Sequence, residues 1–494
     1  MISPINKRIV FYTTLALSLI LLGVPGCRTD DPLIDIAGSG FPAAVGKIIL
    51  VKCATSGCHN DQSKAAAAGL SLSSWNTAFE GGRNGACIIP YRPDYSLCMY
   101  YVNTFPDLGP SLVPHMPYLQ TALSRTEVLT LQNWISQGAP DRNGNIKFSG
   151  DPNRKKIYVT NQGCDEVAVI DAQTKLVMRY IHVGASAQIE SPHKIKISPD
   201  GNFWYVSFIN GKNFRKYRTA DDTYVGEIPV GAGSWNSFDI TSDSKYSFIG
   251  DWNSPGRIEY LDLNALSVLS TYQSASPGFI DWPHGIAVNN NSTTLYVGAN
   301  NDRYVYKIDV SDPIHPPSFN NIPLAPTIQK AHDIDFSPDG TKYMVACTQS
   351  NEVRILKVSN DSVIAVIPTG YYPQEIAVST STPYAFISCQ EDSTLFPGYG
   401  KKGMVTVINY LTNSFVANID AGTYQPHGID VDDVNGLVYV ASRNINPTGP
   451  APHHTSVCGG RDGYLTIIDM HTLKQVIGYR PEMAVDPYSV AVRP

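Results

Sequence analysis

The feature that most constrains this chain is a short strand that recurs seven times after about residue 155. Its repeats span from 41 residues (Tyr205 to Tyr246) to 55 residues (Tyr384 to Tyr439). Repeats of this length with several strands each predict a β-propeller. The seven copies read KIYVTN (156–161), FWYVSF (203–208), KYSFIG (245–250), TLYVGA (294–299), KYMVAC (342–347), PYAFIS (383–388) and LVYVAS (437–442).

A preceding strand recurs in the same register and predicts how the ring closes. Its copies include PHKIKIS, PHGIAVN and, at the end of the chain, PYSVAVR. The last copy has no strand after it, and the first repeat has none before it. We therefore expect 487–494 to complete the first blade, which hides the edges that an open sheet would expose. The predicted fold is a small all-α domain followed by an all-β seven-bladed propeller over 155–494.

The phrase IYVTN (157–161) resembles the repeat of the YVTN family of seven-bladed propellers. The resemblance covers the 155–494 region and implies the fold. Because propellers serve as platforms for many unrelated functions, it implies no activity.

The N-terminus has the pattern of an export signal. Lys7 and Arg8 precede an apolar run over 9–22 that is short for a membrane span, and GVPGC then ends at Cys27. This segment resembles a bacterial lipobox, which implies a lipoprotein signal peptide over 1–27 and a lipid on Cys27. An ordinary signal peptide with an incidental cysteine is the alternative. Residues 28–40 read as a tether, so we expect a periplasmic or cell-surface lipoprotein anchored to a membrane.

Composition limits the partners. The net charge is −6 and only 16% of residues are charged, so nothing predicts nucleic-acid binding. An exported chain can oxidise its thiols, and nine cysteines are present. Cys87 and Cys98 are close in sequence and are the first pair that we expect to be joined.

Residues 41–145 predict a small, mostly helical domain. We expect a helix over 41–54 that leads into Cys53, and another over 124–140. The second has a capping box at Ser124 and Glu127, an apolar face, and Gly138 as its stop signal.

The stretch CATSGCH (53–59) carries the candidate cofactor site. Covalent c-type haem needs two thiols and an adjacent histidine, usually spaced C-x-x-C-H. Here the spacer has four residues, and Gly57 would let the longer loop bulge. Two alternatives stay open. One is a zinc site of Cys53, Cys58 and His59 with Cys87 or Cys98, and the other is a Cys53–Cys58 disulfide.

Further stretches resemble the small cytochrome c-like domains found beside repeat domains in exported bacterial proteins. They are GLSLSSW (69–75), PYRPDYS (90–96), HMPYL (115–119) and LQNWISQGAP (131–140). The resemblance implies haem c attached to Cys53 and Cys58, with His59 and Met116 as iron ligands. His115 is an alternative to Met116. The four-residue spacer and Tyr118, where a second proline is usual, depart from the pattern.

Aligned inner strands place one equivalent residue per blade at the channel: His193, Asn236, His284, His332, Gln374, His427 and Tyr488. Four histidines in seven positions suggest copper or another transition metal there, because imidazole is a common metal ligand. The arrangement is similar to the propellers of nitrous oxide reductase and of the nitrite reductase with a d-type haem, in fold and ligand type only. An insertion in blade seven would add His453 and His454. Histidines that only contact backbone or substrate are the alternative.

These observations favour an exported, lipid-anchored redox protein. Haem c would exchange electrons with a partner protein or a small-molecule substrate, and the propeller would hold that partner or a second metal centre. The chain could be part of an oxidoreductase, but no catalytic acid, base or nucleophile is evident. The alternative is a non-catalytic binding propeller with a disulfide-supported N-terminal domain. A lactonase-like hydrolase is disfavoured because its divalent cation prefers carboxylate and amide ligands.

Overall fold

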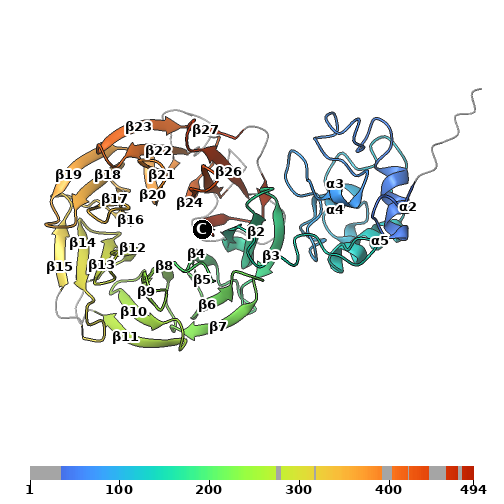
Figure 1. Cartoon of the computed structure of the whole chain (residues 1–494). Helices are drawn as coiled ribbons and strands as arrows, with labels where there is room; N and C mark the ends of the chain where they lie inside the picture. Colours follow the sequence, from blue (N-terminus) through green and yellow to red (C-terminus); the bar gives the residue numbers. More distant parts are fainter. Residues whose placement is uncertain are drawn as a thin grey trace, which may run out of the picture.

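The computed structural model describes residues 35–273, 280–315, 319–391, 403–420, 422–443, 463–476 and 481–493. Seven sheets are arranged around a central axis, and a helical domain (residues 35–148) lies beside the ring (Figure 1). The predicted seven-bladed propeller is therefore confirmed.

Each blade is an antiparallel sheet of four strands, with one additional short strand in blade seven. Blade one contains β29 (Pro487–Val492), β1 (Lys156–Asn161), β2 (Glu166–Asp171) and β3 (Val177–His182). Blade two contains β4 (Pro192–Ile197), β5 (Phe203–Phe208), β6 (Asn213–Arg218) and β7 (Tyr224–Pro229). Blade three contains β8 (Trp235–Ile240), β9 (Tyr246–Asp251), β10 (Arg257–Asp262) and β11 (Ser267–Gln273).

The remaining four blades repeat the pattern. Blade four contains β12 (Pro283–Val288), β13 (Thr294–Ala299), β14 (Tyr304–Asp309) and β15 (Phe319–Pro323), and blade five contains β16 (Ala331–Phe336), β17 (Lys342–Cys347), β18 (Glu352–Lys357) and β19 (Val363–Pro368). Blade six contains β20 (Tyr371–Val378), β21 (Tyr384–Glu391), β22 (Met404–Asn409) and β23 (Ser414–Ile419). Blade seven contains β24 (Pro426–Asp432), β25 (Leu437–Ser442), β26 (Gly463–Asp469), β27 (Lys474–Gln475) and β28 (Glu482–Met483).

The last strand closes the ring, as the sequence predicts. β29 pairs antiparallel with β1, with Tyr158 opposite Ala491. Thr160 Oγ1 accepts a hydrogen bond from the backbone N–H of Ser489 at 2.9 Å. Because the two ends of the propeller meet in one sheet, β1 is paired on both sides and the ring is closed.

The inner strands approach one another closely, and two glycines permit this. A Cβ on Gly285 would lie 2.8 Å from the Cα of Asp333, and one on Gly428 would lie 2.4 Å from the carbonyl oxygen of Tyr488. Contacts this short leave no room for a side chain. Apolar side chains fill the spaces between neighbouring blades and form the propeller core.

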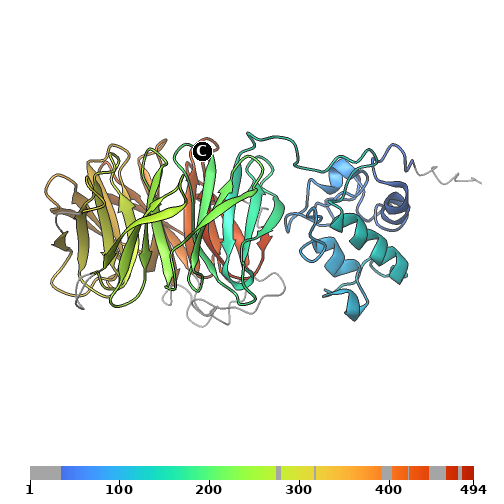
Figure 2. The same cartoon turned by 90° about the horizontal axis from the view of Figure 1, so that it is seen from below.

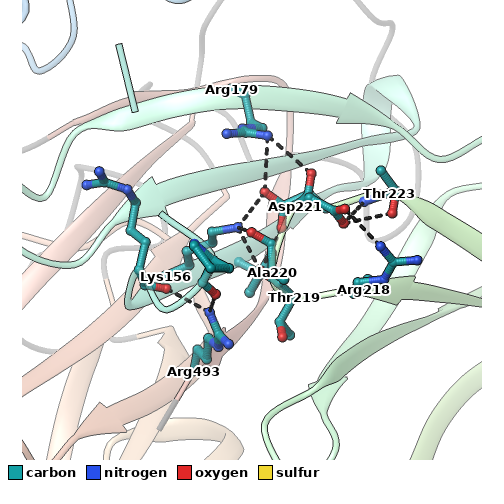
Figure 3. A network of polar contacts seen from close by, with 12 residues as sticks. Lys156, Arg179, Arg218, Thr219, Ala220, Asp221, Thr223 and Arg493 are labelled. Atoms are coloured by element: carbon teal, nitrogen blue, oxygen red, sulfur yellow. Dashed lines mark hydrogen bonds and ion pairs between the residues drawn. The ribbon is translucent and has the colours of Figure 1, made fainter. Parts of the chain in front are cut away.

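A buried polar network joins blade one to blade two (Figure 3). Lys156 Nζ lies 2.9 Å from the Asp222 carboxylate and donates to the carbonyl oxygen of Thr219 at 2.7 Å. Tyr158 also donates its hydroxyl proton to Asp222, at 2.8 Å. The Lys156 and Asp222 side chains are almost fully buried, so the ion pair has lost its water and depends on this geometry.

The helical domain contains α2 (Ala43–Lys52), α3 (Trp75–Ala78), α4 (Leu97–Val102), α5 (Arg125–Ser136) and a 3-10 turn at Pro106–Leu108. Both predicted helices are present, and α5 has the predicted Ser124–Glu127 capping box. Gly138 follows α5 with φ +95°, as its stop-signal role requires. Within the described residues, no helix combines the length and apolar character needed to span a membrane.

The helical domain contacts the rim of the propeller at blades one and seven (Figures 1 and 2). Arg92 Nη1 lies 3.0 Å from Glu166 of β2, and Tyr95 stacks on Tyr180 of β3 with ring centroids 4.3 Å apart. Ala86, Ile89 and Tyr95 also join an apolar cluster with side chains of both blades. These contacts dock the helical domain on the propeller.

Candidate functional site

A cavity of about 540 Å³ in the helical domain brings together the four residues predicted to hold haem. Cys53, Cys58, His59 and Met116 all line it. A volume in this range suits a small organic ligand or cofactor. Much of the remaining wall is small or apolar: Ala66, Ala67, Ala68, Leu70, Leu72, Leu97, Val102, Pro114 and Pro117.

The loop after α2 turns back on itself and places His59 next to the first cysteine. The Cys58 N–H donates to the carbonyl oxygen of Thr55 at 3.0 Å, and the His59 N–H donates to that of Cys53 at 3.0 Å. Gly57 has φ +79° and open space where a Cβ would be. The four-residue spacer therefore forms the bulge that the sequence predicts.

The His59 side chain is suited to act as a neutral ligand. Its Nδ1 atom is buried without a hydrogen-bond partner. Burial lowers the pKa of His59, and the nearby carbonyl groups of Leu70 and Ala67 oppose this shift. The lowered pKa favours the unprotonated imidazole at neutral pH, which has a lone pair for a metal.

Met116 reaches the cavity and its neighbour His115 does not. The Met116 N–H donates to the carbonyl oxygen of Tyr101 at 2.8 Å, which fixes the segment against the end of α4. Met116 is partly buried and lines the cavity, whereas His115 is exposed and absent from its lining. The structure thus favours Met116 over the alternative His115.

Four thiols share this cavity. Cys53, Cys58, Cys87 and Cys98 all line it as free cysteines. Burial raises the pKa of Cys53 to about 12, with added effects of Cys87 and Cys58, so its thiol is protonated at neutral pH. Neither the expected Cys87–Cys98 bond nor the alternative Cys53–Cys58 bond is formed. Among the described residues, no three His, Cys, Asp or Glu side chains come close enough to hold a metal ion, so the zinc alternative gains no support.

The channel histidines do converge. His193, His284, His332 and His427 come from four inner strands, and each is at most 9% exposed. Successive ring centroids lie 3.7 Å (His284–His332), 5.3 Å (His332–His427) and 6.3 Å (His427–His193) apart. Asn236, Gln374 and Tyr488 occupy the equivalent buried positions in the other three blades. The alignment of the seven repeats is therefore confirmed.

Two of these imidazoles contact backbone carbonyl groups. His284 Nδ1 lies 2.7 Å from the carbonyl oxygen of His332, and His332 Nδ1 lies 3.2 Å from that of Gln374. His427 is fully buried, and its Nδ1 lies 3.7 Å from Glu375 Oε1. Burial, followed by the neighbouring imidazoles, holds the pKa of His427 well below its usual value. In the part of the channel that the structure describes, the side chains form no three-ligand metal group.

Sequence reasoning missed a set of charged side chains that lies next to the channel histidines. Lys194 Nζ pairs with Glu375 Oε1 at 2.9 Å, and Lys196 Nζ pairs with Asp239 Oδ1 at 2.7 Å. Burial raises the pKa of Glu375 to about 7, and the charge of Lys194 opposes the shift. The signal was available in the sequence, because each of these four charged residues follows the aligned channel position of its own repeat by one or three residues.

Some predicted positions lie outside the described residues: the lipobox with Cys27, and His453 and His454 of the blade-seven insertion. Cys164, to which the sequence assigned no role, is disulfide-bonded. Cys347 and Cys389 are fully buried free thiols on β17 and β21.

Comparisons with known proteins inform only the fold. No family model matches the chain, and no curated protein matches it. A solved structure described as a functionally unknown protein from Desulfotomaculum acetoxidans matches with 16% identity and a TM-score of 0.51 over 67% of this chain and 99% of that one. The Kuenenia stuttgartiensis hydrazine synthase matches with 17% identity and a TM-score of 0.47 over 58% of this chain and 78% of that one. The Desulfotomaculum acetoxidans structure shares the fold of this chain, and neither similarity assigns an activity.

Proposed function

We propose that this chain is an exported, lipid-anchored electron-transfer protein whose helical domain is cytochrome c-like and binds haem c. One observation carries the proposal: Cys53, Cys58 and His59 of one loop and Met116 of a distant segment line the same cavity. The propeller, of YVTN type, serves as the platform that receives a redox partner protein or a small-molecule substrate.

The residues present fit this cofactor. One loop supplies two thiols for thioether bonds and, next to the second thiol, the imidazole that would bind the iron. His59 has a buried nitrogen without a partner, and Met116 supplies a thioether sulfur from a different segment. The small and apolar side chains around the cavity match the character of a porphyrin face.

Bound haem supplies one-electron transfer, with an iron potential set by its axial ligands and by solvent access. In this domain Cys53 and Cys58 would fix the cofactor, and His59 and Met116 would hold the iron. A His–Met pair favours a relatively high reduction potential. The apolar walls exclude water, which disfavours the more highly charged oxidised state. Because all four of these residues would hold the cofactor, we propose electron transfer here and leave the reaction to the partner.

Export and anchoring belong to the same proposal. Lipidation of Cys27 would hold the protein at a membrane without a spanning helix. The disulfide at Cys164 supports an oxidising compartment such as the periplasm or the cell surface.

Occupation of the channel by copper stays a separate prediction. Four converging, buried imidazoles support it. The described side chains do not form a ready three-ligand group, so we derive no step through a metal there. Metal analysis of the purified protein tests it: about one copper per chain is the predicted result, and haem iron alone would contradict it.

A pyridine haemochrome spectrum of the full chain, produced with c-type haem maturation, tests the main proposal. We expect covalent haem in the parent and none in Cys53→Ser/Cys58→Ser. The matched control is Cys347→Ser/Cys389→Ser, which removes two buried thiols far from the cavity and should retain haem. A haem-free parent under competent maturation would refute the proposal and favour a non-catalytic binding propeller.

A further inference from the structure

Two of the four cavity thiols have no role in haem attachment. Thioether bonds require only Cys53 and Cys58, yet Cys87 and Cys98 line the same cavity. Cys87 is buried, and Cys98 is the second residue of α4. An exported domain with two additional thiols beside its cofactor site needs a way to keep them from reacting there.

The backbone holds these two cysteines side by side. The Cys98 N–H donates to the carbonyl oxygen of Cys87 at 3.1 Å. This bond brings the two backbones together across the turn, and a close backbone approach is what a disulfide requires. The Cys98 thiol is also in hydrogen-bond contact with the Cys87 thiol, which raises the pKa of Cys98.

The intervening segment is tied in place. Ser96 Oγ accepts a hydrogen bond from the Ile89 N–H at 2.8 Å and donates one to the carbonyl oxygen of Arg92 at 2.8 Å. The Tyr91 N–H donates to the carbonyl oxygen of Ile135 at the end of α5. Because the turn is fixed at both ends, the two thiols would need only a small side-chain movement to bond.

Cys87 and Cys98 are free thiols in this structure. We propose that they are oxidised to a disulfide in the mature protein, the pair that their closeness in sequence predicts. Each thiol loses one proton and one electron, a sulfur–sulfur bond forms, and the disulfide of an exported thiol oxidase accepts the electrons and protons to become a dithiol. The bond closes the 87–98 turn, fixes one cavity wall and leaves only Cys53 and Cys58 as thiols for thioether formation. This inference goes beyond the proposed function, and it stands whether or not haem is bound.

Peptide mapping of the exported full chain tests it directly. The protein is denatured in iodoacetamide without reductant and digested with trypsin. Cleavage after Arg83 and Arg125 yields one peptide with both Cys87 and Cys98, whereas cleavage after Lys52 and Lys64 yields a separate peptide with Cys53 and Cys58. We expect the 84–125 peptide to be unalkylated and two hydrogens lighter than its reduced form. Cys347 and Cys389, alkylated in the same digest, are the internal control.

Two results would overturn the inference. One is alkylation of both Cys87 and Cys98 without reductant, and the other is a cross-link between the 84–125 and 53–64 peptides. Cys98→Ser provides a second measurement, because it should leave Cys87 open to alkylation in the denatured chain. A haemochrome spectrum of the same sample separates the two proposals: a linked pair without haem refutes only the haem proposal, and haem without the link refutes only this one.

Discussion

At the scale of single residues, the cavity depends on which side chains face it. Met116 lines the cavity together with Cys53, Cys58 and His59. Spacing alone does not single out this residue, whereas the resemblance to cytochrome c-like domains does. The full four-thiol cluster depends on tertiary packing. From the sequence, Cys87 or Cys98 joined Cys53 and Cys58 only as one ligand of the alternative zinc site. The lowered pKa of His427 likewise results from its burial in the ring, followed by the imidazoles of three other blades.

Replacement of Met116 tests its role as an iron ligand. Met116→His should lower the reduction potential by on the order of 0.1 V or more, because a second imidazole stabilises the oxidised iron relative to a thioether. Spectroelectrochemical titration measures this shift. His115→Ala is the matched control, since His115 is exposed outside the cavity lining, and it should leave the potential unchanged. Equal potentials in the parent and Met116→His would exclude Met116 as the ligand.

Burial of the Glu259 carboxyl group should make the stability of the propeller depend on pH. This residue of β10 is 5% exposed, and its Oε2 has no hydrogen-bond partner. Burial raises its pKa from 4.5 to about 7, while Arg257 opposes the shift. Between pH 4.5 and about pH 7, the Glu259 carboxyl group is protonated in the folded state and ionised in the unfolded state. The free energy of unfolding therefore falls as pH rises through this window.

Glu259→Gln removes this dependence, because glutamine does not titrate. Above pH 7 we expect the variant to be more stable than the parent by on the order of 1–3 kcal/mol, and the gain should shrink toward pH 4.5. Urea unfolding at pH 5 and pH 8 measures both free energies. Glu80→Gln, an exposed substitution in the helical domain, is the control. The same gain at both pH values would contradict the assignment to Glu259.

At the scale of elements, the repeats were enough to predict the seven blades and the closing strand. This worked because each inner strand keeps the same alternation, so β29 could be recognised as the strand missing from blade one. The Lys156–Asp222 ion pair could not be predicted, because Asp222 lies in the loop before β7, outside the repeated strands. It depends on how β1 of blade one meets the loop before β7.

Removal of Asp222 should destabilise the junction of blades one and two. Asp222→Ala leaves the Lys156 ammonium group buried without its partner, so we expect a loss of about 3–5 kcal/mol in the free energy of unfolding. Asp221→Ala is matched in position and type, but it breaks the exposed pair with Arg218 and should cost less than about 1 kcal/mol. Urea unfolding followed by tryptophan fluorescence compares them. Equal losses would mean that the buried pair contributes no more than the exposed one.

At the scale of the whole molecule, the docking of the helical domain on the propeller is new information. The sequence defined two domains but gave no relative placement, since the contacts join single residues from distant segments. Arg92, Tyr95 and Gly85 meet blades one and seven, and Gly85 also lines the cavity. The proposed cofactor therefore lies close to the propeller surface, where a docked partner could reach it.

Weakening this docking should free the helical domain without unfolding it. Arg92→Ala/Tyr95→Ala removes the ion pair with Glu166 and the ring stack on Tyr180. We expect faster proteolysis in the 149–155 connection and a larger radius of gyration in solution scattering, with unchanged haem content. Arg125→Ala breaks an exposed pair with Asp107 inside the helical domain and serves as the control. An unchanged cleavage rate in the double variant would show that these contacts do not hold the domains together.

The mass of the peptide that contains Cys53 and Cys58, taken from the mature full chain after denaturation, tests the central claim most directly. The account predicts one haem bound to this peptide through two thioether bonds, with neither cysteine available for alkylation. A haem-free peptide with both cysteines alkylated, from a host that matures c-type cytochromes, would contradict it.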